Sequence, residues 1–371
     1  MSSSDSLVAS HIAGIVPYVP GKPIDEVERE LGLPPGRAIK LASNENALGP
    51  SPRAVAAMRD AAASSHLYPD GSAWTLRQAL AERHGVAPEE IVVGAGSNEL
   101  INLLVQAFVG QGEEALLAEQ SFLCYELACR ALGAAYRRVP LLNLTFDLDG
   151  MAAAASPRTK IVFVANPNNP TGTYVARATL ARFLDRLPPR VIVVVDEAYF
   201  EYADAPDYPD ALQYRARRPR LVVLRTFSKI HGLAGMRVGY AICEPEIAGY
   251  LHRVRAPFNV SSGAQAAALA ALGDDEHVRR SRASNLAERP RLAQALERLG
   301  CAVLPSQANF LLVETPAQPL SAAGLYQALL RRGVIVRPLA NYALPDHLRI
   351  TVGTPQENDC LVDHLRGILR T

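Results

Sequence analysis

The segment RTFSKIHGLAGMRVGY, residues 225–240, places a single lysine directly after a hydroxyl residue and near an arginine. Lys229 follows Ser228 and the apolar run 221–224, and Arg237 lies eight positions further on. A lysine at the end of a strand is usually a solvated charge. A desolvated lysine beside another cation instead loses its proton near neutral pH and acts as a nucleophile or base. The groups at the other strand ends decide between these interpretations.

Two further apolar runs end in polar side chains. Asp196 follows the run VIVVV directly, and Tyr199 comes shortly after it. An unpaired carboxylate behind a buried strand is costly, so Asp196 needs a cationic partner unless it only caps a turn. The run KIVFVANP leads into NPNNPTG (166–172), where two X-Pro pairs and a glycine hold Asn169 in a rigid turn. An ordinary turn would contain the same residues.

A glycine-rich loop, GAGSNEL (94–100), opens a helix at Ser97, Asn98 and Glu99. Free N–H groups at a helix N-terminus suit a phosphate. Glu99 in the first turn equally suits a plain helix cap, so this loop alone leaves both interpretations open.

The elements that must position these residues alternate between short apolar runs and helical stretches. The candidate strands are 91–95, 115–119, 134–141, 160–167, 191–198, 220–227 and 237–242, and the helices between them include 75–84, 98–109, 123–132 and 176–187. Continuous apolar strands separated by helices indicate a parallel sheet buried on both faces. This is the α/β doubly wound architecture, which binds ligands beyond the carboxyl ends of its strands.

The remaining segments suggest four parts of the chain. We expect a disordered tail over 1–12, an arm rich in proline and glycine over 13–50, a large sheet domain over 51–258 and a small α+β domain over 259–371. The small domain is expected from the helices 263–273 and 277–299 and the short strands 302–304, 309–314, 334–337 and 348–352. The N-terminal arm would complete it.

Bulk composition limits the possible functions. The chain has 371 residues, of which 49% are hydrophobic, and this length suggests two domains. Its net charge of +1 provides no global field for nucleic acid or an anionic membrane. The five cysteines include no C-x-x-C pair and the eight histidines no H-E-x-x-H motif, so we expect no metal. Without a signal segment or a long apolar run, we expect a soluble, cytoplasmic protein.

Taken together, the strand ends offer a phosphate site, a fixed asparagine, a buried carboxylate with a tyrosine, and a lysine. Pyridoxal 5′-phosphate chemistry needs this set of groups. Lys229 would form a Schiff base with the cofactor, and Asp196 would keep the pyridine nitrogen protonated so that the ring accepts the electrons of a carbanion. Arg237 and desolvation would lower the pKa of Lys229.

With these residues in place, the chain resembles the fold-type I pyridoxal-phosphate-dependent aminotransferases, and within them the histidinol-phosphate aminotransferase group. The resemblance extends from about residue 15 to residue 369. It rests on seven motifs in the order of the family: LASNENALGP (41–50), YPDG (68–71), VGAGSNEL (93–100), NPNNPTG (166–172), VDEAY (195–199), TFSKIHGLAGMRVG (226–239) and LRITVGT (348–354).

The resemblance implies a role for each of the matching residues. Lys229, Asp196 and Tyr199 would be catalytic, and Tyr199 and Asn169 would hydrogen-bond the phenolate oxygen of the cofactor. The expected cofactor-binding set is Ser97, Asn98, Glu99, Phe122, Asn169, Asp196, Tyr199, Ser228, Lys229, Arg237 and Tyr68. Within it, the phosphate would be held by Ser97, Asn98, Ser228 and Arg237.

Tyr68 resembles the tyrosine that reaches the cofactor phosphate from the neighbouring subunit, which implies a homodimer with shared active sites. Phe122 stands where the family stacks an aromatic ring on the pyridine. The segment EQSFLCY (119–125) departs from the usual family sequence there, so Tyr125 is the alternative ring. Ala47 replaces a common proline in the arm motif.

For the substrates, Arg349 matches the family arginine that grips an α-carboxylate, and Arg337 is a second anion contact or a solvated strand-end charge. Tyr18 and Asn44 in the arm would close over the substrate. The implied ping-pong reaction interconverts L-histidinol phosphate and 2-oxoglutarate with imidazole-acetol phosphate and L-glutamate. The alternatives are an aromatic amino acid aminotransferase, a decarboxylase of a phosphorylated amino acid, and a non-catalytic pyridoxal-phosphate-binding protein.

Overall fold

The computed structural model describes residues 7–17, 20–316 and 320–369, and Tyr18 lies outside these ranges. Residues 10–12, which we expected in a disordered tail, belong to helix α1 (Ser10–Ala13) instead. This helix lies on α6 (Cys124–Ala131), where Arg130 donates a hydrogen bond to the Gly14 carbonyl. The His11 ring also packs against Gly133 just after α6, and these contacts explain why the segment is ordered.

The large domain is built on a seven-stranded sheet. Its strands, in spatial order, are β2 (Ile91–Gly94), β8 (Gly239–Ile242), β7 (Leu221–Thr226), β6 (Ile192–Asp196), β5 (Thr159–Ala165), β3 (Glu114–Ala118) and β4 (Ala135–Val139). The predicted doubly wound, mainly parallel sheet is therefore confirmed. Strand β8 is antiparallel to both neighbours. It follows β7 through a loop that contains only the short 3-10 helix η4 (Ala234–Met236), and an antiparallel partner needs no crossover helix.

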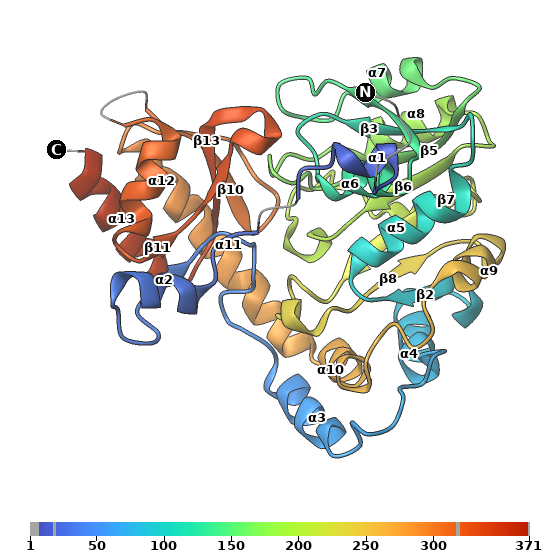
Figure 1. Ribbon diagram of the computed structural model, residues 1–371, viewed down its shortest axis with the longest axis horizontal. Helices are drawn as coiled ribbons and strands as arrows, with labels where there is room; N and C mark the ends of the chain where they lie inside the picture. Colours follow the sequence, from blue (N-terminus) through green and yellow to red (C-terminus); the bar gives the residue numbers. More distant parts are fainter. Residues whose placement is uncertain (1–6, 18–19, 317–319, 370–371) are drawn as a thin grey trace.

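Helices cover both faces of this sheet (Figure 1). Helices α5 (Ser97–Phe108), α6 and α9 (Pro245–Val254) pack together on one face, and α7 (Leu148–Ala154) and α8 (Arg177–Arg186) pack together on the opposite face, as right-handed crossovers that run in opposite directions along the sheet require. At the β2–β8 edge, α3 (Pro52–Ala62), α4 (Trp74–His84) and α10 (Ser262–Leu272) cover the face that α5 leaves open. Successive residues of β2 point to opposite faces. Val92 accordingly packs in the core that contains α5, whereas Ile91 and Val93 pack in the core that contains α3, α4 and α10.

The small domain contains two sheets and receives part of the arm. The antiparallel sheet has the order β12 (Arg337–Leu339), β13 (Leu344–Thr351), β10 (Phe310–Glu314) and β9 (Ala302–Val303), and the helices α12 (Ala322–Leu330) and α13 (Pro355–Leu369) pack on it. The arm contributes helix α2 (Ile24–Leu31) and strand β1 (Ile39–Lys40), which pairs in parallel with β11 (Val334–Ile335). Val27 of α2 buries its side chain against Ile335.

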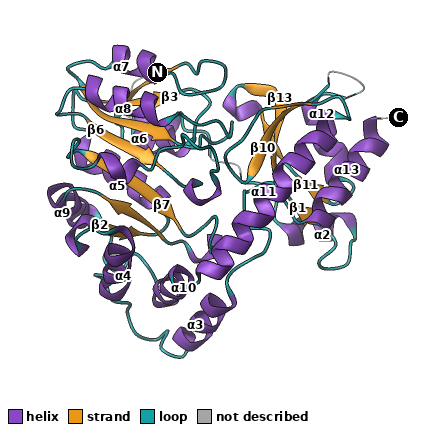
Figure 2. Cartoon of the chain, turned by 180° about the vertical axis from the view of Figure 1, so that it is seen from behind, coloured by secondary structure: helices purple, strands orange, loops and turns teal. Residues whose placement is uncertain are grey.

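Packing does not follow the expected domain boundary at residue 259. Helix α10 packs against α3 and α4, and its Ala264 and Ala268 belong to a core of the large domain. The small domain begins instead along α11 (Asp275–Glu297), which runs from one domain to the other (Figure 2). Val278 packs near the large-domain residue Tyr202, whereas Leu292 is in the core of the small domain. No helix in the described ranges has both the length and the hydrophobicity needed to cross a membrane.

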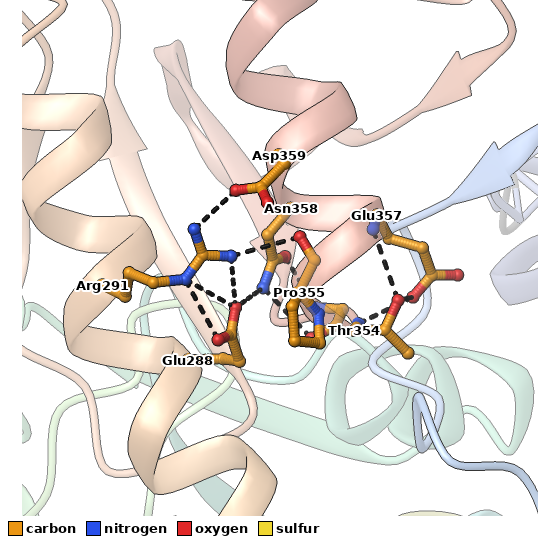
Figure 3. Close-up of polar contacts among 8 residues, drawn as sticks. Glu288, Arg291, Thr354, Pro355, Glu357, Asn358 and Asp359 are labelled. Carbon is orange, nitrogen blue, oxygen red and sulfur yellow. Dashed lines mark hydrogen bonds and ion pairs between the residues drawn. The ribbon is translucent and has the colours of Figure 1, made fainter.

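A polar cluster joins α11 to the turn between β13 and α13 (Figure 3). The Asn358 amide donates to Glu288 at 2.8 Å and accepts from the Gly353 N–H at 2.9 Å. Arg291 donates to Glu288 and to the exposed carboxylate of Asp359. Because Gly353 follows β13 closely, the cluster fixes the end of the strand that carries Arg349.

We predict that Asn358→Ala lowers the free energy of unfolding by about 2–4 kcal/mol, because Gly353 and Glu288 lose buried hydrogen bonds. The matched control is Asp359→Asn, since this neighbouring side chain is 61% exposed. Loss of its ion pair with Arg291 should cost about 0–1 kcal/mol. Urea unfolding of both variants measures the difference. Equal losses would contradict the structural role assigned to Asn358.

Candidate active site

The carboxyl ends of the parallel strands, the arm and the small domain enclose a cavity of about 210 Å³. The expected site residues that line it are Asn44, Ser97, Asn98, Phe122, Asn169, Asp196, Tyr199, Ser228, Lys229, Arg237, Arg337 and Arg349. The other lining residues are Gly21, Ala42, Ser43, Tyr125, Ala165, Pro167, Ala198 and Thr226. Residues from the arm and from several loops and strands of both domains thus meet at one place.

Lys229 is part of the cavity wall. Its amine donates a hydrogen bond to the Ser43 carbonyl of the arm at 3.0 Å and lies 5.6 Å from the centre of the Tyr199 ring. Burial, and then the charges of Arg349 and Arg237, lower the pKa of Lys229 to about 7. A substantial fraction of the amine is therefore unprotonated at neutral pH, as a nucleophile or base requires.

Asp196 ends strand β6 and is only 4% exposed. Its Oδ2 accepts a hydrogen bond from the Tyr125 hydroxyl at 2.8 Å, and its Oδ1 accepts one from the Ala198 N–H at 3.2 Å. Burial raises the pKa of Asp196 to about 6, although the two donors and the charge of Lys229 oppose the rise. The carboxylate thus remains largely ionised at pH 7 and faces the cavity, where it can accept from a cationic N–H group.

An anion site lies at the N-terminus of α5. Gly96 has a φ of 78°, and a Cβ on it would lie 2.5 Å from the Arg237 guanidinium. A Cβ on Gly239 would lie 2.7 Å from the Ser97 nitrogen. These two positions require glycine so that Arg237 and the start of the helix can lie side by side. The free N–H groups of a helix N-terminus beside an arginine suit a phosphate.

Two polar side chains complete this anion site. Arg237 donates to the Ser228 hydroxyl at 3.4 Å. The Oδ1 atom of Asn98 is buried and has no hydrogen-bond partner within the described chain. This amide oxygen can accept a hydrogen bond from a donor group of a ligand, whereas a phosphate oxygen would be bound by the backbone N–H groups at the start of the helix.

Glu99, which we expected to bind the cofactor, does not line the cavity. Its carboxylate accepts hydrogen bonds from the Ala95 N–H at 2.5 Å and from Asn259 at 2.6 Å. It therefore closes the loop before α5, as in the alternative reading of a helix cap, and a carboxylate facing the phosphate would repel it. The structure thus favours the cap for the carboxylate of Glu99, and a contact of Glu99 with the cofactor stays a prediction.

The two candidate stacking residues have different surroundings. Phe122 and Tyr125 meet edge to face, with ring centres 5.6 Å apart. Tyr125 is buried, stacks on Phe163 at 4.8 Å, and commits its hydroxyl to Asp196. Phe122 is only half-buried and lines the cavity. The geometry thus favours Phe122 as the ring on which a planar ligand would stack.

Two arginines line the small-domain side of the cavity. Arg337 and Arg349 lie directly opposite each other in the β12–β13 pair. Arg349 donates to Asn169 at 2.6 Å and to the Ala42 carbonyl at 2.7 Å, and both of these acceptors are neutral. Like charges directly opposite each other are unfavourable, so an anion between the two arginines would stabilise the pair.

Asn44 and Tyr68, two further expected site residues, differ in whether they reach the cavity of their own chain. Asn44 donates to the Tyr199 hydroxyl at 2.9 Å, which links the arm to the cavity. Tyr68 does not line the cavity of its own chain. It is 83% exposed and stacks on Phe258 at a distance of 4.7 Å.

Sequence reasoning missed the backbone carbonyls of Ala42 and Ser43, which accept from Arg349 and Lys229. Every residue has a backbone carbonyl, so the residue type does not indicate this role. Only the position of Ala42 and Ser43 within the motif LASNENALGP could have suggested it. The bond from Tyr125 to Asp196 was also missed. Tyr125 was considered only as a stacking ring.

Comparisons with known proteins agree with this geometry. Residues 37–365 match the family described as aminotransferase class I and II. A histidinol-phosphate aminotransferase of Anaeromyxobacter sp. is 55% identical over 364 residues, which cover 98% of this chain and 99% of the relative. One of Moorella thermoacetica is 47% identical over 359 residues, covering 96% and 92%. A crystal structure of histidinol-phosphate aminotransferase from Sinorhizobium meliloti, in complex with pyridoxal-5′-phosphate, superposes with a TM-score of 0.88, 29% identity and 99% coverage of both chains.

We predict that acylation of Lys229 in the apoprotein rises with a midpoint near pH 7, against an ordinary amine value of 10.5. Lys22 is the internal control, because a hydrogen bond from its amine to Glu30 raises its pKa. Peptide mass spectrometry after brief treatment with an amine-specific reagent at a series of pH values measures both. In Arg349→Met, the Lys229 midpoint should move upward. Lysines that titrate together would contradict the desolvation of Lys229.

Proposed function

The chain belongs to the class I and II aminotransferase family, and we propose that it interconverts L-histidinol phosphate and 2-oxoglutarate with imidazole-acetol phosphate and L-glutamate. Relatives that bear the name of this activity match nearly the full length of the chain. The observation within the site that carries the proposal is the pair Arg337 and Arg349, which lie opposite each other beside the cavity that contains Lys229.

The cofactor of this aminotransferase is pyridoxal 5′-phosphate, and the cavity fits it. The anion site at α5, the half-buried ring of Phe122 and the ionised Asp196 correspond to a phosphate, a planar ring and a ring nitrogen. When bound, the cofactor supplies a carbonyl that condenses with amines and a ring that withdraws electrons from the adjacent carbon. Ser97, Asn98, Ser228 and Arg237 would hold its phosphate.

The protein supplies the proton transfers and the orientation. Lys229, with its pKa lowered to about 7, takes up and returns a proton at neutral pH. Asp196 would keep the ring nitrogen of the cofactor protonated, and Tyr199, which accepts a hydrogen bond from Asn44, would donate to the phenolate oxygen together with Asn169. Each of these groups approaches the cavity from a rigid strand end or from the arm.

The two arginines would serve both halves of the ping-pong reaction. Glutamate carries an α-carboxylate, whereas histidinol phosphate carries a phosphate and no α-carboxylate. Arginine binds both anions through paired N–H groups. Arg349 donates hydrogen bonds to two neutral acceptors, Asn169 and the Ala42 carbonyl. An anionic group of the substrate would take the place of these acceptors and form stronger, charge-assisted hydrogen bonds.

The proposed assembly is a cytoplasmic homodimer with shared active sites. Tyr68 and Phe258 form a stacked and exposed aromatic pair, and Leu67 and Trp74 nearby in sequence are 61% and 60% exposed. A stretch of chain with several large exposed apolar side chains is a candidate contact surface. If a second copy covers them, Tyr68 is available to the partner's cavity.

The substrate proposal predicts that kcat/KM for histidinol phosphate exceeds that for phenylalanine or tyrosine by about 1000-fold or more, because a site built for a phosphate rejects ligands that lack it. Most of this lead should vanish in Arg337→Ala. Arg331→Ala, which removes an exposed arginine of the same domain, should keep the lead. Equal or better activity with phenylalanine would instead support an aromatic amino acid aminotransferase.

The dimer proposal predicts restored activity when Lys229→Ala and Tyr68→Ala subunits are combined. In the heterodimer, the site that keeps Lys229 receives Tyr68 from the other subunit, so one of the two sites is intact. Purification through two different affinity tags isolates this species, and its activity should approach half that of the native dimer. If Tyr68 served its own chain, neither site would be intact, and the mixture would stay inactive.

A further inference from the structure

Tyr125 is placed to act on Asp196 rather than on the ring of the cofactor. Its hydroxyl donates to Oδ2 of Asp196 at 2.8 Å, and its side chain is 1% exposed. The residue lies in the first turn of α6, whereas Asp196 ends β6. The hydrogen bond therefore connects two separate elements behind the cavity.

The position of the hydroxyl is fixed by the packing of the Tyr125 ring against two aromatic neighbours. One face of Tyr125 stacks on Phe163 of β5, with ring centres 4.8 Å apart and planes inclined by 17°. Phe122 meets it nearly at right angles, at 88°. Burial and the nearby Asp196 raise the pKa of Tyr125 well above its ordinary value, so the hydroxyl keeps its proton and remains a donor.

The hydrogen bond opposes the effect of burial on Asp196. Burial favours the neutral acid, and a donated hydrogen bond favours the carboxylate. Around this carboxylate the other ionisable groups are Lys229, Cys124 and Tyr199. The charge of Lys229 also favours the carboxylate, and Cys124 stays a neutral thiol because burial and Asp196 raise its pKa to about 12. Tyr199 lies beside Tyr125 and Lys229.

We propose that Tyr125 is a positioning residue that holds Asp196 in the ionised form and orientation needed to pair with the ring nitrogen of pyridoxal phosphate. A proton shared between a carboxylate and a pyridine stays on the nitrogen only if the carboxylate is the weaker base. By donating to Oδ2, Tyr125 weakens that base and leaves the rest of the carboxylate for the nitrogen. The proposal rests on the role of Asp196 in the proposed function, and it does not depend on which amino donor the enzyme uses.

The test compares two ligands of the apoprotein by titration calorimetry. Pyridoxal phosphate has the ring nitrogen, and 1-deazapyridoxal phosphate has carbon in its place. Both share the phosphate, the carbonyl and the reaction with Lys229, so the ratio of their dissociation constants isolates the pairing with Asp196. In Tyr125→Phe the preference for pyridoxal phosphate should fall by about 10- to 100-fold, the value of a hydrogen bond to a charged group.

The pH dependence of the same ratio provides a second measurement. In the native protein the preference should decline as the pH falls through about 6, where Asp196 takes up its proton. Loss of the hydroxyl raises the pKa of Asp196, so in Tyr125→Phe the decline should begin at a higher pH. Titration of Lys229 and of the phosphate affects the binding of both ligands equally, so it cancels in the ratio of their dissociation constants.

The control is Tyr240→Phe, which removes another buried tyrosine hydroxyl, one that bonds His84 at 2.9 Å outside the cavity lining. It should leave the ratio unchanged and should lower the melting temperature about as much as Tyr125→Phe. If Tyr125→Phe weakens both ligands equally, Tyr125 only packs against Phe122, and the proposal fails. If Asp196→Asn leaves the preference intact, the assigned role of Asp196 fails instead.

Discussion

The desolvation of Lys229 is the constraint on which the rest of the site depends. Removing this amine from water lowers its pKa to about 7 and makes it reactive, but it also makes any protonated fraction costly. The surrounding groups lower the free-energy cost of the protonated amine. The Ser43 carbonyl accepts from the amine, and the carboxylate of Asp196 provides a compensating charge. Parallel pairing of β6 and β7 places the ends of both strands at the same edge, so the sheet itself sets this proximity.

The arm forms hydrogen bonds both to Lys229 and to the small domain. Strand β1 pairs with β11, and three residues later the Ser43 carbonyl meets Lys229. The Ala42 carbonyl accepts from Arg349 of β13. Asn44 has a φ of 56° and donates to Tyr199 of the large domain. A short stretch of arm is thus bonded to both domains, and the residues that would hold the substrate are positioned relative to the lysine through it.

Sequence reasoning identified the groups that violate the ordinary rules of burial. Asp196 and Lys229 stand at the ends of apolar strands, and a charge in that place needs a special reason. The strands were found because they are continuously apolar, but an apolar run does not show its direction, so the antiparallel β8 could not be read from it. Helix α10 is rich in alanine on all sides, and its packing partner is not visible in its pattern. The bond from Tyr125 to Asp196 depends on tertiary packing between α6 and β6, which no local motif contains.

The charge balance of the cavity is completed only by its ligands. In the described chain the lining contains the cations Lys229, Arg237, Arg337 and Arg349, and Asp196 is the carboxylate among them. Glu99 lies close by, but its charge is directed to Ala95 and Asn259 and does not enter the cavity. A phosphate monoester carries about −1.5 to −2 at pH 7, so the cofactor phosphate and Asp196 together offset most of the charge of the three arginines, and Lys229, with a pKa of about 7, adds only part of a charge. Arg337 and Arg349 come from β12 and β13 of the small domain, whereas Arg237 lies beside the start of α5. The arginines of the cavity therefore come in two groups, one beside α5 that would hold the cofactor phosphate and one on the small domain that would bind an amine donor carrying its own phosphate.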